Sequence, residues 1–307
     1  MKVLAHIHTF NDADIIDRTI DAVLRQTRPV DGILVVDNAS SDGTLERPSL
    51  KRATVLRHDE NLGTSGAVAS GFRFALEQDY DWVWLFDADS TPEPDALEKL
   101  LTLYIGWPQA WQEQIGFLSC LPHNVPDGSL LHGGLFTARG LGQARPVPEE
   151  RYYRCDFTIW SGCLYRAAAI RRIGLPDANY VLDWGEHEYA YRVMKADFKA
   201  FIVQDAIMHH NVRGHITVKP AEVHLGPLGF RYVILPPIRC YYLCRNGFYF
   251  GLYVFKEGGL HLLFSDGKEM VKLTVKYLLH PRRHRQLIFA CVRGIWHGLT
   301  GNLAARY

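Results

Sequence analysis

Short apolar runs alternate with helical periods over the first third of the chain. The runs have the length and composition of buried strands, and the segments between them place apolar residues at helical spacing. The expected strands are residues 2–8, 32–36, 53–57 and 82–86, and the expected helices are residues 13–26 and 64–78. Strands that alternate with helices in this way predict an α/β fold, with a mostly parallel sheet covered by helices on both faces.

The remainder of the chain has a weaker pattern. We expect strands at residues 116–120 and 199–203. We also expect one helix that begins near residue 167 and another over residues 185–196. From about Lys219 onward the alternation stops, and the sequence favours helices with aromatic and basic faces. We therefore expect an α/β domain over residues 1–218 and a C-terminal helical region over residues 219–307.

Composition and charge narrow the class of protein. Of the 307 residues, 48% are hydrophobic and 22% are charged, which is typical of a globular protein. The formal net charge of +1 provides no chain-wide positive field, so we expect no nucleic-acid partner. Positive charge gathers instead in residues 256–307, which hold nine Lys or Arg and three Asp or Glu. This segment is a candidate contact for an anionic membrane surface or another subunit, and a solvated basic rim is the alternative.

The cysteines and the apolar segments indicate a compartment. Six cysteines without any C-x-x-C pair favour a reducing cytosol over a disulfide framework. The first residues lack the apolar stretch of a signal peptide, and no segment approaches the ~20 apolar residues that span a bilayer. We expect a cytoplasmic protein without a transmembrane helix.

Polar side chains collect where the expected strands end. Thr9 follows the first strand, Asp37 the second and Asn61 the third, and Asp87 and Asp89 follow the fourth. In parallel sheets, ligands bind beyond the carboxyl ends of the strands. The sequence therefore predicts a binding site at this edge.

Asp87 and Asp89 are the strongest candidates for chemistry. Alternation along a strand puts both carboxylates on one face, with only Ala88 between them. Two carboxylates this close repel each other unless a cation lies between them. Mg²⁺ and Mn²⁺ prefer oxygen ligands of this kind, whereas the alternative interpretation is a solvated turn before the next helix.

Four motifs, in order along the chain, resemble family 2 glycosyltransferases of the GT-A fold, particularly their rhamnosyltransferase and galactofuranosyltransferase branch. The resemblance covers residues 1 to about 215. Its motifs are VVDNASSDGT at 35–44, NLGTSGAVASGF at 61–72, FDAD at 86–89, and WSGCLYR at 160–166 followed by DWGEHEYAYR at 183–192.

The resemblance implies a nucleotide-diphosphate sugar as donor and a divalent metal, Mn or Mg, as cofactor. The donor-side residues that it implies are Thr9, Asp37, Asn61, Gly63, Gly66 and Asp87. Asp37 would accept a hydrogen bond from the base, although a turn that satisfies backbone amides is the alternative for this carboxylate. The metal ligands would be Asp87, Asp89 and a histidine after the strand near 203, with His209 favoured over His210.

On the acceptor side, the resemblance implies a general base and several substrate contacts. The base would be Glu186, and the substrate contacts would be Trp160, Gly162 and Glu188. The branch usually shows W-D-D-x-E-Y, whereas this chain has Gly185 and Glu186 in place of the two Asp residues, so Asp183 is retained as a second candidate base. The alternatives are an acidic helix start for Glu186 and a core position for Trp160.

Together these features predict a metal-dependent, inverting glycosyltransferase of the hexosyltransferase type. It would move a rhamnose- or galactofuranose-type sugar from a nucleotide-diphosphate donor to a glycan or lipid-linked acceptor in cell-surface polysaccharide synthesis. Its partners would be these substrates, the inner face of the cell membrane and a second copy of the chain. Two alternatives are a nucleotidyltransferase, for which HTFNDADI offers no glycine-rich phosphate loop, and a non-catalytic binding protein of the same fold.

Overall fold

The computed structural model describes residues 1–125, 127–211, 219–225, 228–263, 268, 274–275, 278 and 281–307. The chain divides into two compact units. The first contains Met1–Leu135, Gln143–Ala178 and Gly185–Val212, and the second contains Phe136–Gly142, Asn179–Trp184 and Arg213–Tyr307. The boundary expected between 218 and 219 adjoins residues outside the described ranges, and so the division at that point stays a prediction.

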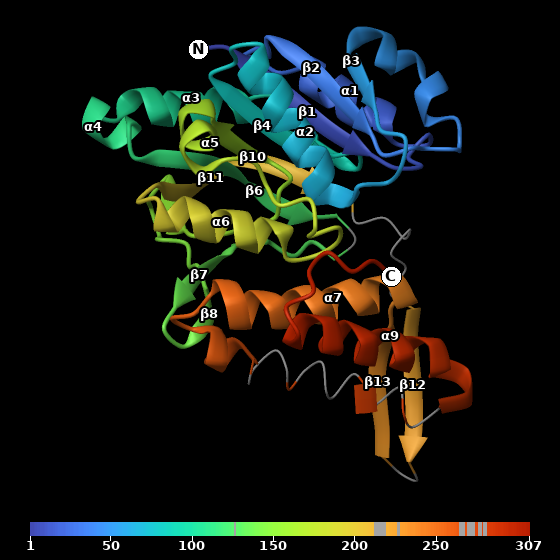
Figure 1. Ribbon diagram of the computed structural model, residues 1–307. Helices are drawn as coiled ribbons and strands as arrows, with labels where there is room; N and C mark the ends of the chain where they lie inside the picture. The colour runs from blue at the N-terminus through green and yellow to red at the C-terminus, as the bar shows by residue number, and fades with distance from the viewer. Residues whose placement is uncertain are drawn as a thin grey trace. The chain divides into compact units, whose positions relative to one another are not determined.

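The first unit is built on a nine-stranded sheet (Figure 1). Its strands are β1 Val3–Thr9, β2 Gly32–Asp37, β3 Thr54–Arg57, β4 Trp82–Asp87, β5 Ser90–Pro92, β6 Ile115–Asn124, β9 Tyr152–Cys155, β10 Cys163–Arg166 and β11 Lys199–His210. They are ordered β3-β2-β1-β4-β10-β6-β11-β5, and β9 pairs with β11. A separate two-stranded ribbon pairs β7 Gly134–Thr137 with β8 Gly140–Gln143.

The sheet is parallel in its first half and mixed beyond it. The pairs β3-β2, β2-β1 and β1-β4 are parallel, as expected from the alternating sequence. Beyond them, β10 runs antiparallel to both β4 and β6, and β5 and β9 run antiparallel to β11. The strands β3, β2, β1 and β4 are thus parallel as expected, whereas the whole sheet is mixed.

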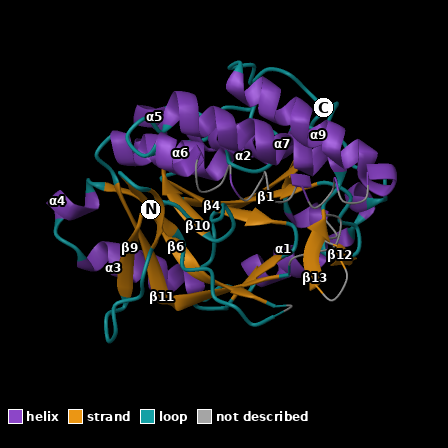
Figure 2. Cartoon of the chain, turned by 90° about the horizontal axis from the view of Figure 1, so that it is seen from below, coloured by secondary structure: helices purple, strands orange, loops and turns teal. Residues whose placement is uncertain are grey.

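Helices cover both faces of this sheet (Figure 2). The helices are α1 Ile16–Leu24 and α3 Ala96–Gly106 on one face, and α2 Gly63–Glu77, α5 Ala167–Ile173 and α6 Gly185–Lys195 on the other. Side-chain alternation along the strands supplies the two cores, since Trp84 packs with the first group and Val83 with the second. The short helix α4 Gln109–Gln112 and the 3₁₀ turns Thr44–Glu46 and Pro48–Arg52 complete the unit.

The second unit pairs two helices and contains a hairpin that the sequence analysis missed. Helix α7 Pro237–Tyr249 continues into a π-helical turn, Phe250–Val254, and packs against α9 Pro281–Leu299 (Figure 1). Strands β12 Lys219–Leu225 and β13 Leu228–Ile234 pair antiparallel, where only helices were expected. Antiparallel strands need only a short connection, so the hairpin leaves no long helix-strand rhythm to detect.

Candidate functional site

The acidic turn after β4 forms a compact group with a histidine from β11. Asp87, Asp89 and His210 each offer one ligand atom, and these atoms lie within 4.8 Å of one another. His210 reaches the turn because β11 pairs antiparallel with β5, which opposes His210 to Ser90. The Ser90 hydroxyl lies 2.8 Å from His210 Nδ1, and this nitrogen lies 3.5 Å from Asp89 Oδ1.

Residues from three other parts of the chain anchor this turn. The buried Thr19 hydroxyl of α1 donates to the Ala88 carbonyl at 2.7 Å, and the Asp87 amide donates to Ser161 Oγ at 3.0 Å. The backbone and side-chain amides of Asn211 both donate to the Asp89 carbonyl at 3.1 Å. The backbone between the two carboxylates is therefore held independently of any ligand, which pre-organises their geometry.

Asp87 has a direct partner that lies outside the sequence motifs. β1 places His8 opposite Asp87, and His8 Nε2 lies 2.7 Å from Asp87 Oδ1. Burial disfavours the charged imidazole, but the charge of Asp87 and their hydrogen bond outweigh it, so the pKa of His8 is raised. Burial likewise opposes ionisation of Asp87, and the charge of His8 prevails, so the pKa of Asp87 is lowered. Asp87 is therefore a carboxylate at neutral pH.

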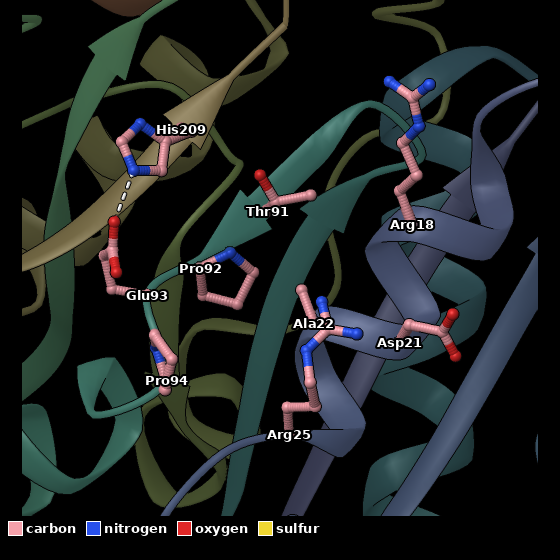
Figure 3. Close-up of a pocket in the computed structure, with 9 residues that line it drawn as sticks. All are labelled: Arg18, Asp21, Ala22, Arg25, Thr91, Pro92, Glu93, Pro94 and His209. Carbon is pink, nitrogen blue, oxygen red and sulfur yellow. Dashed lines mark hydrogen bonds and ion pairs between the residues drawn. The ribbon is translucent and has the colours of Figure 1, made fainter.

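His209, the histidine favoured from the sequence, lies outside this group. Its Nε2 is 2.6 Å from Glu93 Oε1, and both residues line a pocket of about 370 Å³ beside helix α1. Figure 3 shows this pair at the edge of the pocket, across from Arg25 and Ala22 of α1. Adjacent residues of a strand point to opposite faces, so His209 and His210 cannot both face Asp89. The geometry therefore groups His210, rather than His209, with the two carboxylates, and the metal ligand itself stays a prediction.

Glu186 lies in the first turn of α6 and is electrostatically coupled to the acidic turn. Burial opposes its ionisation, but the charge of His187, whose Nδ1 lies 3.5 Å from Glu186 Oε1, prevails and lowers the pKa of Glu186, while the charge of Asp87 acts in the opposite direction. Burial also raises the pKa of the Cys163 thiol to about 12, with further contributions from the charges of Asp87 and Glu186. The charges of Asp87 and Glu186 both act on the Cys163 thiol, so Glu186 lies within electrostatic range of the β4 turn.

Asp183, the second candidate base, has a different environment in the second unit. Arg239 donates to its Oδ1 at 3.1 Å, and Asn246 Nδ2 donates to its carbonyl at 3.0 Å. Its φ of 56° is left-handed, as is the φ of 68° at Trp184. These contacts give Asp183 a structural role in a strained turn before α6.

The strand ends of β1 and β2 meet as expected. Thr9 is in register with Asp37, one residue beyond the pairing of His8 with Asp87. Asp37 is fully buried, accepts from the Ser40 amide at 3.1 Å and lies 3.6 Å from Arg57 Nε. Its carboxylate therefore caps the turn after β2, which is the alternative raised from the sequence. The Thr9 hydroxyl donates to Asp12 at 2.9 Å.

Gly63 and Gly66 lie in the first turn of α2, and Asn61 lies just before it. The Gly63 amide donates to Asn61 Oδ1 at 2.8 Å, and Gly63 has a left-handed φ of 72° that favours glycine. Asn38 Nδ2 donates to the Gly63 carbonyl at 3.3 Å, which ties this segment to the end of β2. Strand register and a hydrogen bond thus bring together polar residues from the end of β1, the end of β2 and the start of α2, although these segments are far apart in the sequence.

Trp160, Gly162 and Glu188 have contacts that explain them structurally. The Trp160 ring packs against Phe72 and Tyr189 in the core. Gly162 has a φ of 84°, and its amide donates to the Leu85 carbonyl at 2.8 Å. Both oxygens of Glu188 are bound by Arg192, at 2.7 and 3.0 Å. These contacts give no support to their expected role at the acceptor, which stays a prediction.

The donor atoms at the acidic turn suit a divalent cation. Two carboxylates match the preference of Mg²⁺ and Mn²⁺ for oxygen ligands, and the imidazole of His210 favours the softer Mn²⁺. The side chains of all three residues are partly exposed, so a ligand in solution can reach the turn. This edge can therefore hold a cation, and Glu186 is coupled to it through the charge of Asp87.

Comparisons with known proteins find sugar-transferase relatives and a similar fold. Residues 5–111 match the family described as glycosyl transferase family 2. Galactofuranosyltransferase GlfT1 of Mycobacterium tuberculosis (strain ATCC 25618 / H37Rv) is 27% identical over 277 residues, which cover 86% of each chain. The dTDP-rhamnosyl transferase RfbF of Shigella flexneri is 22% identical over 291 residues, 88% of this chain and 87% of the relative. Among solved structures, mannosyltransferase PcManGT from Pyrobaculum calidifontis in complex with GDP-Man and Mn²⁺ aligns with a TM-score of 0.54 and 15% identity over 97% of this chain and 87% of that chain.

Proposed function

The chain belongs to glycosyl transferase family 2 and is a glycosyltransferase with the GT-A fold, and from this premise we propose that it is a metal-dependent, inverting enzyme. It moves a sugar from a nucleotide-diphosphate donor to a glycan or lipid-linked acceptor in cell-surface polysaccharide synthesis. The observation that carries the proposal is the group of Asp87, Asp89 and His210 together with the charge coupling of Asp87 to Glu186.

The leaving diphosphate needs positive charge where its own negative charge develops. Asp87, Asp89 and His210 would hold a divalent cation, Mn²⁺ or Mg²⁺, which stabilises that charge when bound. His8 positions Asp87 through the 2.7 Å contact, and Asp37, Thr9, Asn61, Gly63 and Gly66 are our candidates for the nucleotide side. Support for this side comes from the register that brings the ends of β1, β2 and β4 to one edge.

Glu186 is our candidate for the general base. A carboxylate accepts the proton of the acceptor hydroxyl as that oxygen bonds to the anomeric carbon, and the bond from this carbon to the diphosphate breaks on the opposite face. The lowered pKa of Glu186 keeps it ionised at neutral pH. Its position at the start of α6, where the helix dipole favours negative charge, supports the same state.

The donor sugar is proposed from the relatives. The names of two relatives that align over most of this chain specify galactofuranosyl and rhamnosyl transfer, so we favour a sugar of one of these types. We place the reaction in the cytoplasm at the inner face of the cell membrane. All six cysteines are buried thiols outside any disulfide, which suits a reducing compartment. No helix in the described ranges has the length and apolarity to cross a membrane.

A thermal-shift panel of nucleotide sugars, with and without Mn²⁺, tests the proposed donor site. A ligand that binds only the folded form at about 100 times its Kd stabilises it by about 2.7 kcal/mol. We expect such stabilisation from a rhamnose or galactofuranose donor, and its loss when a chelator removes the metal. No shift from any nucleotide sugar would contradict the proposal, and pyrophosphate release from a nucleoside triphosphate would favour nucleotidyl transfer instead.

The choice between the two histidines gives a matched pair of variants. His210→Ala should weaken Mn²⁺ binding at least about tenfold, because it removes a donor atom from the group. His209→Ala should leave the affinity unchanged, since its imidazole pairs with Glu93. Titration of free Mn²⁺ by electron paramagnetic resonance measures both. A larger loss in the His209 variant would reverse our assignment.

A further inference from the structure

Helix α9 of the second unit presents large apolar side chains outward. Phe289, Val292, Trp296 and Leu299 are 64%, 55%, 64% and 44% exposed. Their spacing of three, four and three residues places them on a single side of the helix. Isolated exposed apolar residues are common, whereas a continuous stripe of this kind marks an interaction surface.

The opposite side of α9 shows that this orientation is fixed. Ala290 and Cys291 are buried against α7. A Cβ on Gly294 would lie 2.4 Å from the Tyr241 carbonyl oxygen, and one on Gly298 would lie 2.6 Å from the Arg245 carbonyl oxygen. Only small residues fit this contact, so α9 cannot rotate to bury its large side chains. The helix thus packs its small residues inward and exposes its large apolar ones.

A tyrosine from the preceding segment extends the stripe. The Tyr253 hydroxyl donates to the Leu299 carbonyl at 2.8 Å, and the Tyr253 side chain is 45% exposed. We call these five residues the α9 outer face: Tyr253, Phe289, Val292, Trp296 and Leu299. Aromatic rings with a polar tip, as in tyrosine and tryptophan, are suited to the boundary between lipid and water.

Charge distinguishes between two partners for the outer face, a second copy of the chain and an anionic membrane. Arg285 is exposed and lies four residues before Phe289, on the same side of the helix. Residues 256–307 carry nine Lys or Arg against three Asp or Glu. A second copy of the chain would bring two segments of like net charge together, whereas an anionic lipid surface attracts this charge. An apolar stripe on one side of a helix suits contact at the membrane surface.

We propose that the α9 outer face binds the surface of an anionic membrane, with its apolar side chains among the acyl chains and Arg285 near the lipid phosphates. The α9 outer face would be the surface that serves the membrane-side localisation proposed above. It does not depend on the transfer reaction, because the contact involves only residues of the second unit.

The test is co-sedimentation of the full chain with vesicles. Wild-type protein should bind vesicles of phosphatidylcholine and phosphatidylglycerol, and bind less at high salt or to phosphatidylcholine alone. The double variant Phe289→Ser/Trp296→Ser should reduce the partition coefficient at least tenfold. Ile105→Ser is the matched control, because Ile105 is 59% exposed on α3 of the first unit and should not affect binding.

Several outcomes would overturn the proposal. Absence of wild-type binding, or equal loss in the Ile105 control, would contradict a contact through α9. A wild-type dimer that the double variant dissociates in sedimentation velocity, without vesicle binding, would assign the face to a second copy. Arg285→Glu removes no apolar packing and should also weaken vesicle binding. It therefore tests the contact even if the double variant misfolds. Nucleotide-sugar thermal shifts of each variant without vesicles should match the wild type, so failure of the donor proposal would be visible separately.

Discussion

Asp89→Asn should lower kcat/KM for sugar transfer by about 10³-fold. The substitution keeps the size of the side chain and removes the negative charge that, with Asp87 and His210, would hold the cation against the leaving diphosphate. Groups that stabilise charge developing in the transition state typically contribute effects of this size. Initial rates at varied donor and Mn²⁺ concentrations measure the loss, and Mn²⁺ titration should show weakened binding in the same variant.

Glu93→Gln is the matched control for this prediction. Glu93 lies four residues further along and pairs with His209 at 2.6 Å, outside the acidic group. The Glu93→Gln substitution should leave kcat/KM near the wild-type value. This result would show that loss of a nearby negative charge is not sufficient to reduce activity. If Asp89→Asn kept wild-type activity and metal affinity while circular dichroism showed a folded protein, the metal assignment would be incorrect.

The acidic turn could be predicted from the sequence because its signal is local. Two carboxylates with one residue between them stay close together in the sequence whether the second lies in the strand or in the turn after it. The structure keeps Asp87 at the end of β4 and Asp89 in the turn that follows. The ends of β1 and β2 could be predicted for the same reason, since parallel strands align their carboxyl ends at one edge.

The histidine could not be chosen from the sequence because β11 is irregular. Its pairing with β6 shifts register between Val203 and Ile207. As a result, Val203 and Ala206, three residues apart, pack in the same core cluster, which strict alternation does not allow. Counting from the apolar run therefore gives no information on which of His209 and His210 faces Asp89. The bulge becomes visible only when the partner strands are known.

Tertiary partners were equally hidden. His8 pairs with Asp87 only because β1 and β4 are neighbours in this register, although they are far apart in the sequence. The same holds for Ser161, whose hydroxyl anchors the Asp87 amide. The motif around Trp160 and Gly162 suggested substrate contacts, whereas a tight left-handed turn and an aromatic core account for these residue types. Motif similarity alone does not separate these two causes of a residue choice.

Glu186→Gln should lower kcat for transfer by about 10²- to 10⁴-fold, the usual contribution of a positioned general base. The amide cannot accept the proton of the acceptor hydroxyl, although its size and its position at the start of α6 are retained. Donor and Mn²⁺ binding should stay close to wild type, because Glu186 is outside the group of Asp87, Asp89 and His210. Single-turnover transfer assays and nucleotide-sugar thermal shifts measure the two properties separately.

Asp183→Asn decides between the two candidate bases. Asp183 already binds Arg239 at 3.1 Å, so its neutralisation should weaken that ion pair and change kcat by less than about tenfold. The reverse pattern, with near wild-type transfer by the Glu186 variant and loss of transfer by the Asp183 variant, would assign the base to Asp183. Loss of transfer together with loss of donor binding in the Glu186 variant would instead indicate that Glu186 maintains the site, because a base that acts only on the acceptor leaves donor affinity unchanged.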